Sequence, residues 1–137
     1  MIRRKLRTLE ALVLLLLAWA ALRIVPVRHL LPADRVIPES GVIPSDSEGS
    51  RPAHDTALAV RGSLRAAVAR LPLKPTCLAQ SLVAGWMLRR RKIPHRFHLG
   101  ARVKEEFEAH AWVEAAGLVV AGEGDVASYS VMLSRQR

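Results

Sequence analysis

Two residues that could perform nucleophilic catalysis occur in an order that suits a thiol enzyme. The only cysteine, Cys77, follows residues 74–76 and begins an apolar periodic run, which predicts that it lies in the first turn of a helix. His110 lies in the alternating segment 107–114, which is typical of a strand. A helix N-terminus carries partial positive charge that stabilises a thiolate, and an imidazole nearby can complete the ion pair. The two residues therefore indicate a cysteine nucleophile with a histidine base.

Other chemistry is less well supported by the sequence. A packing role for Cys77 and an exposed strand position for His110 are the structural alternatives. A zinc site could draw on Cys77, His95, His98 and His110, but His95 and His98 are three apart on an extended segment and point to opposite faces. We therefore expect no metal. No Gly-x-Ser-x-Gly elbow occurs, and no glycine-rich phosphate loop occurs, so we expect no nucleotide or other cofactor.

The elements that must position this pair follow from hydrophobic periodicity. Residues 32–54 are rich in Pro, Ser, Gly and acids and are predicted to be a linker between an N-terminal hydrophobic helix in 1–31 and a domain in 55–137. The cysteine helix follows Pro75 and closes at Arg89–Lys92, a basic end that is either solvated or docks an acidic partner. One helix followed by strands is an α+β arrangement. The expected helices are 5–25, 55–71 with Asp55 as N-cap and 77–92, and the expected strands are 97–103, 107–114, 118–121 and 129–133.

The N-terminal helix allows three interpretations. A basic head precedes Ala11–Leu22, a run without charge that is short for a bilayer span of about 20 residues. Ala18-Trp19-Ala20 imitates a signal-peptide cleavage site, but Arg23 and Arg28 continue the helical pattern beyond it. The segment is thus a docked or partner-covered helix, a membrane contact through residues 9–25, or a cleaved signal.

The net charge indicates which classes of partner suit the chain, and the cysteine count indicates its compartment. Lys and Arg number 21 and Asp and Glu 12, a net charge of +9 that favours a polyanion, an anionic membrane surface or an acidic peptide. Nucleic acid is disfavoured, because one Tyr and two Phe offer few rings for base stacking. A single cysteine forms no internal disulfide, so nothing requires an oxidising compartment and we expect a cytoplasmic protein.

Three segments resemble a known family. Residues 75–82, with the sequence Pro-Thr-Cys-Leu-Ala-Gln-Ser-Leu, the arginine-rich helix end before Ile93, and residues 108–114, with the sequence Glu-Ala-His-Ala-Trp-Val-Glu, resemble the leader peptidases of lasso peptide biosynthesis, the B proteins. The resemblance covers roughly residues 58–133. It implies a transglutaminase-like, papain-type core in which a cysteine at a helix N-terminus is followed by an antiparallel β-meander. It further implies that 55–137 is a cysteine peptidase domain of the split type, without a leader-recognition domain.

The resemblance implies a specific function. Cys77 would attack the carbonyl at the leader–core junction of a ribosomally synthesised precursor, and His110 would activate the thiol and protonate the departing amine. The implied partners are the precursor peptide, a separate leader-recognition protein and a macrolactam synthetase. The alternatives are a transglutaminase-like acyl transferase and a non-enzymatic, membrane-associated basic scaffold.

The sequence departs from the family at the third catalytic position. The resemblance places an acid about a dozen residues after the histidine, where this chain has Ala121-Gly122. Asp125 is the expected substitute and would need a β-bulge at Gly122 or Gly124. Glu123, which strict alternation turns to the other face, and Glu108, two residues before His110, are the alternatives.

Overall fold

The computed structural model describes residues 1–30 and 50–136 of the chain. Most of the linker predicted for 32–54 lies outside these ranges. The elements in chain order are α1 (Ile2–Ile24), α2 (Val27–Leu30), α3 (Arg51–Val68), α4 (Cys77–Arg90), β1 (Arg96–Val103), β2 (Phe107–Ala115), β3 (Leu118–Ala121), the 3-10 helix η1 (Val126–Ser128) and β4 (Ser130–Gln136).

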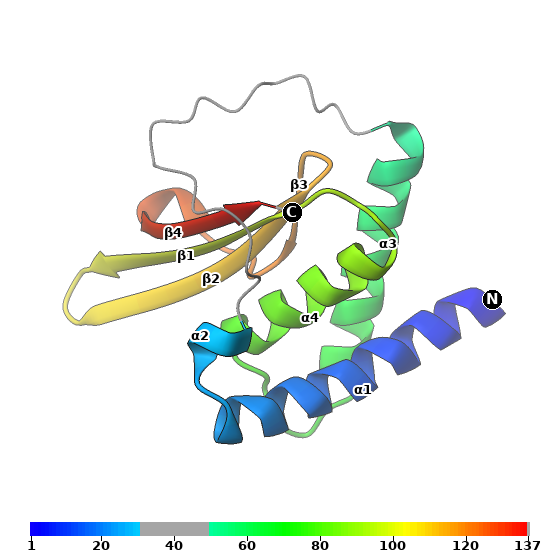
Figure 1. Cartoon of the computed structure of the whole chain (residues 1–137), viewed down its shortest axis with the longest axis horizontal. Helices are drawn as coiled ribbons and strands as arrows, with labels where there is room; N and C mark the ends of the chain where they lie inside the picture. Colours follow the sequence, from blue (N-terminus) through cyan, green and yellow to red (C-terminus); the bar gives the residue numbers. More distant parts are fainter. Residues whose placement is uncertain (31–49, 137) are drawn as a thin grey trace.

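Helices and sheet form separate layers, as the α+β prediction requires. The helix α4 packs against β2, α3 packs against β3, and α1 lies outside against both α3 and α4 (Figure 1). The expected fold class, a cysteine at a helix start beside an antiparallel sheet with an additional N-terminal helix, is therefore confirmed.

The cysteine helix α4 is the central element of this arrangement. It begins because the Thr76 hydroxyl accepts a hydrogen bond from the Ala79 N–H at 3.2 Å, and it ends before Lys92, whose φ is +56°. Its middle, residues 81–85, is buried on every side. Burial on all faces holds the helix, and hence the cysteine at its first position, between the outer helices and the sheet.

The sheet is antiparallel with the strand order β3-β2-β1-β4. A two-residue turn at Ala116 and Gly117, with φ of +48° and +76°, joins β2 to β3. These first three strands form the expected meander, whereas β4 pairs with β1. The chain returns to β1 through η1, which brings Tyr129 close to His110.

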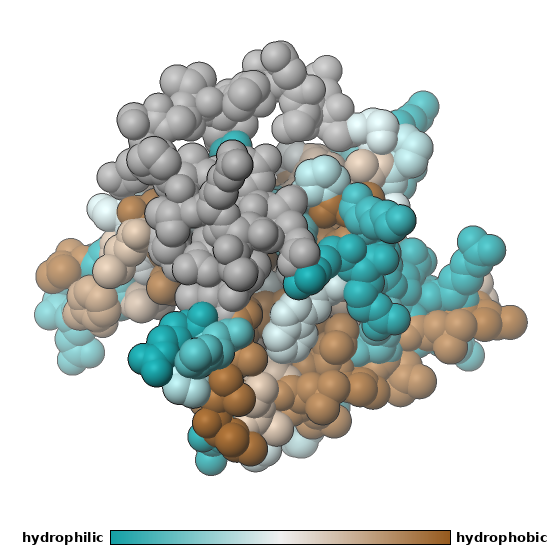
Figure 2. All heavy atoms as spheres, in the orientation of Figure 1, coloured by the Kyte–Doolittle hydropathy of each residue, from teal (hydrophilic) through white to brown (hydrophobic). Residues whose placement is uncertain are grey.

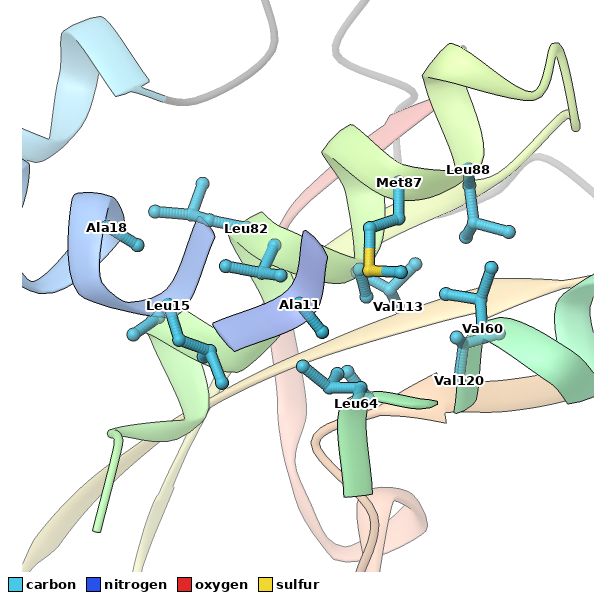
Figure 3. Packing of buried hydrophobic residues seen from close by; sticks show 14 of the residues in the cluster. Ala11, Leu15, Ala18, Val60, Leu64, Leu82, Met87, Leu88, Val113 and Val120 are labelled. Atoms are coloured by element: carbon cyan, nitrogen blue, oxygen red, sulfur yellow. The ribbon is translucent and has the colours of Figure 1, made fainter. Parts of the chain in front are cut away.

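The core joins all layers. Figure 3 shows Ala11, Leu15 and Ala18 of α1 facing Leu64 of α3 and Leu82 of α4. Because the α1 residues are at most 1 % exposed, the N-terminal helix is part of the folding unit. No helix in the described ranges is long and apolar enough to cross a membrane.

One expectation about a helix end is wrong. The helix α3 starts at Arg51 with Ser50 as N-cap, four residues before Asp55, because Pro52 has a φ that suits a first helical turn and lacks the N–H that would be unsatisfied there.

The basic end of α4 is exposed at Arg89, Arg90 and Lys92, and it also binds an acid of this chain. Arg91 binds Glu10 of α1 at 2.6 Å, and Arg90 binds the same carboxylate at 3.0 Å. Hydrogen bonding from Arg91, more than any other effect, lowers the pKa of Glu10. The cluster therefore fastens α1 to α4.

Candidate active site

Cys77 and His110 line the same pocket. It has a volume of about 230 Å³ and lies between α3, the start of α4 and the end of β3. The structure thus brings together the two residues that the sequence singled out. The other lining residues are Leu64, Arg65, Gln80, Val120, Ala121, Gly122 and Glu123.

Cys77 is the first residue of α4 and carries a partly buried free thiol. The Thr76 side chain and carbonyl accept from the N–H groups of Ala79 and Gln80. The amides of Cys77 and Leu78 have no hydrogen-bond partner among the described residues. Two unpaired N–H groups beside the thiol provide positive potential for a thiolate and donors for an oxyanion.

His110 is oriented by a main-chain carbonyl. Its Nε2 lies 2.7 Å from the Gly122 oxygen. A carbonyl only accepts hydrogen bonds, so the ring proton sits on Nε2 and Nδ1 is left as the basic atom. The tautomer needed for a histidine base is therefore set without a carboxylate.

The conformation of Gly122 excludes a side chain at this position. Its φ is +73°, and a Cβ there would lie 2.0 Å from the Ala111 oxygen and 2.8 Å from the Cα of Trp112. This glycine is thus required for the close approach of the two strands. An acid at residue 122, where the resemblance places it, cannot fit on this backbone.

The three acids proposed as its substitute lie in different places. Asp125 is exposed and precedes η1, and no hydrogen bond links it to His110 in the described part of the chain. The bulge lies between β2 and β3 at Val113/Glu114, and not at Gly122 or Gly124. The structure does not bring Asp125 to the histidine, and its role as third catalytic residue stays a prediction.

Glu108 and Glu123 are both held by arginines. Glu108 is exposed and binds Arg102 at 2.5 Å, and this hydrogen bond is the main reason that the pKa of Glu108 is lowered. Glu123 lines the pocket and binds Arg61 at 2.7 Å as well as Arg65. Since Glu123 follows Gly122, its ion pairs to α3 also fix the carbonyl that orients His110.

Aromatic rings pack along the histidine. The ring of Tyr129 stacks on His110 with centroids 5.1 Å apart, and Trp112 stacks at 6.0 Å. A Cβ on Gly100 would lie 2.9 Å from a ring carbon of Trp112 and 3.0 Å from the Cβ of Tyr129, so the glycine makes room for both side chains. Burial, chiefly, raises the pKa of Tyr129. Gly100 and Tyr129 were not predicted as neighbours of His110, although a glycine inside an alternating strand indicates a close approach of another chain segment.

The histidines of the zinc alternative make other contacts. His95 lies 3.0 Å from the Ile93 carbonyl and beside Gly85 of α4. His98 binds Glu114 at 3.2 Å and stacks on Trp112, and its hydrogen bond is the main cause of the lowered pKa of Glu114. Within residues 1–30 and 50–136, no three His, Cys, Asp or Glu side chains gather in a way that could hold a metal ion.

Comparison of the sequence with known protein families supports a cysteine-type site. The sequence profile of the transglutaminase-like superfamily matches residues 12–134. The chain belongs to this superfamily. Its members are generally cysteine-type enzymes and include peptidases and acyl transferases. The match begins inside α1, in keeping with the burial of that helix in the domain core. No curated protein and no solved structure matches the chain.

Proposed function

We propose that the protein is a cysteine peptidase that removes the leader from a lasso peptide precursor. The observation that carries the proposal is the shared pocket of Cys77 and His110, in which Gly122 leaves Nδ1 of the histidine as the base. The choice of a leader peptide as substrate rests on the sequence blocks 75–82 and 108–114. The fold and superfamily support the cysteine chemistry.

The proposed reaction passes through a thioester. His110 Nδ1 takes the proton of the Cys77 thiol, and the sulfur forms a bond to the carbonyl carbon at the leader–core junction. The carbonyl electron pair moves to the oxygen, where the amides of Cys77 and Leu78 can donate to it. The carbon–nitrogen bond then breaks, and the proton on His110 Nδ1 passes to the departing core amine. Water then gives a proton to Nδ1 as its oxygen bonds to the thioester carbon. The carbon–sulfur bond breaks, Nδ1 returns the proton to the Cys77 sulfur, and the leader leaves with a free carboxyl group.

The arrangement of partners follows from the same proposal. A separate leader-recognition protein would present the precursor, and a macrolactam synthetase would use the freed amine of the core. The pocket itself is small, about 230 Å³, which suits a few residues around the scissile bond better than an entire leader. Recognition of the rest of the leader is therefore assigned to the partner.

Mass spectrometry of the precursor tests the proposal. The precursor is incubated with the recognition protein and either the wild type or Cys77→Ala. We expect cleavage at a single junction by the wild type alone. Cleavage by Cys77→Ala would contradict it, and so would an intact precursor with the wild type when the recognition protein is shown to be bound.

Acyl transfer is the second candidate, because the superfamily includes acyl transferases. An amine in place of water would attack the same thioester and give an amide. Adding a primary amine to the reaction separates the two functions. A leader carrying the mass of the amine indicates transfer, and a leader with a free carboxylate indicates hydrolysis.

A further inference from the structure

The N-terminal helix α1 has two apolar sides. Thr8, Ala11, Leu15 and Ala18 are buried against the other helices. The opposite side carries a second apolar row at alternating four- and three-residue spacing, which places its members on one line along the helix. We call this row the outer stripe; it consists of Ile2 (76 % exposed), Leu6 (59 %), Leu9 (57 %), Val13 (49 %) and Leu16 (55 %).

The outer stripe is a ridge. Figure 1 shows α1 at the margin of the molecule, with α3 and α4 on one side of it, and Figure 2 shows apolar residues along its outer surface. Residues 2–16 span about 21 Å at 1.5 Å per residue. Exposed apolar residues in an unbroken row mark an interaction surface.

Cations surround the ridge, and its one acid is neutralised. Arg3, Arg4 and Lys5 are exposed in the first turns. Glu10, the only acid of α1, binds Arg90 and Arg91. An open groove of about 520 Å³ beside the ridge is lined by Arg4, Lys5 and Arg70 together with apolar residues such as Leu9 and Leu12. The exposed side of α1 is thus apolar along the outer stripe and cationic beside it.

The C-terminal end of α1 also places a cation beside an exposed apolar side chain. Trp19 is 48 % exposed, and the guanidinium of Arg23 lies 4.8 Å from its ring centroid. Tryptophan beside a cation is favoured where hydrocarbon meets lipid headgroups. An apolar stripe, cations beside it and an exposed tryptophan are together typical of a helix that lies in the plane of an anionic bilayer.

We propose that α1 is an interfacial helix by which this protein binds reversibly to an anionic membrane surface. The outer stripe enters the headgroup–acyl boundary, and the cations beside it contact lipid phosphates. Because the inner side of α1 belongs to the core, the whole domain moves to the membrane with it. A bilayer accepts a convex ridge without a matching groove, which favours lipid over a partner protein. The net charge of +9 adds long-range attraction.

Vesicle co-sedimentation of the full chain tests this proposal. Vesicles of phosphatidylcholine alone are compared with vesicles of phosphatidylcholine and phosphatidylglycerol in equal parts, at low and high salt. We expect binding to the mixed vesicles that weakens with salt. The double variant Leu9→Glu/Leu16→Glu should lose affinity by about tenfold or more. Leu58→Glu is the matched control, because Leu58 of α3 is 49 % exposed but lies outside the stripe.

Several outcomes would overturn the proposal. They are the absence of wild-type binding to mixed vesicles, equal binding by the stripe variant, and a dimer in sedimentation velocity that the stripe variant abolishes. Circular dichroism checks that the variants fold. If the double variant is unfolded, Arg3→Gln/Lys5→Gln, which changes exposed residues only, must weaken binding to the mixed vesicles. None of these readouts depends on peptidase activity, so this proposal and the proposed function can fail separately.

Discussion

At the scale of single residues, a backbone oxygen orients the histidine, and not the acid that the family resemblance led us to expect. The carbonyl of Gly122 accepts from His110 at 2.7 Å, and no substitution can remove this oxygen directly. The carbonyl can only be moved, and the side chains around it decide its position. Two predictions test this dependence.

Gly122→Ala should abolish the proposed peptidase activity. The added Cβ would lie 2.0 Å from the Ala111 oxygen, so the strand must shift and carry the carbonyl away from His110. We expect a loss of about 100-fold or more in precursor cleavage. The rate at which iodoacetamide alkylates Cys77, the only cysteine, provides a second readout.

Gly117→Ala is the matched control for this prediction. Its φ of +76° is nearly that of Gly122, but a Cβ there meets nothing within 4 Å. It should cost about 1 kcal/mol of unfolding free energy from backbone strain and leave activity intact. Equal activity losses in both variants would contradict a specific role for the Gly122 carbonyl.

Arg61→Gln should lower activity because it lets the Gly122 carbonyl move, and not because it removes a group that lines the pocket. Arg61 holds Glu123 at 2.7 Å but is not among the residues that line the pocket, so its effect must pass through the neighbouring Gly122. We expect roughly a tenfold loss in kcat, an unchanged KM and an altered pH profile of Cys77 alkylation. Arg70→Gln, which changes an exposed arginine in the turn after α3, should alter neither kcat nor the pH profile of alkylation. A loss confined to thermal stability would argue for a purely structural ion pair.

At the scale of elements, an ion pair joins the two helices whose packing shapes the domain. The side chain of Glu10 is 17 % exposed and that of Arg91 is 23 % exposed, so the pair is partly shielded from solvent. The lowered pKa of Glu10 means that the folded state favours its ionised form. The attachment of α1 to α4 should therefore depend on pH.

Glu10→Gln should cost about 1 kcal/mol of unfolding free energy at neutral pH. A depressed pKa contributes stability above the ordinary pKa of a glutamate, and this contribution is lost as the pH falls through the folded value. The unfolding free energies of wild type and variant, measured by urea denaturation, should therefore differ at pH 7 and become equal at acid pH. Glu105→Gln, in the exposed turn after β1, is the control. A difference that persists unchanged into acid would rule out the ion pair as its source.

At the scale of the whole molecule, one helix serves both the core and the outer surface. Leu15 is 1 % exposed and Leu16 is 55 % exposed, although they are neighbours in a uniform run of leucines. Leu15→Ala should lower the unfolding free energy by about 2–4 kcal/mol because it opens a cavity, whereas Leu16→Ala should cost less than about 0.5 kcal/mol. Thermal denaturation measures both. Similar costs would show that α1 is not docked as described.

The sequence by itself determined most of the elements and singled out Cys77 and His110, which line one pocket. Strong periodicity and capping chemistry placed the cysteine helix and three strands within a residue or two, because these signals are local. The start of α3 was misplaced, since Ser50 and Asp55 are both good caps and only the surrounding chain selects between them.

Tertiary structure alone decided the features that depend on distant contacts. The pairing of β4 with β1, the approach of the Gly122 carbonyl to His110 and the binding of Glu123 by α3 each join segments far apart in the sequence. The leucines of α1 are alike in the sequence, and only the positions of α3 and α4 make one row core and the other surface. Local patterns specify which residues can form a helix or a strand, but they do not specify what each face meets.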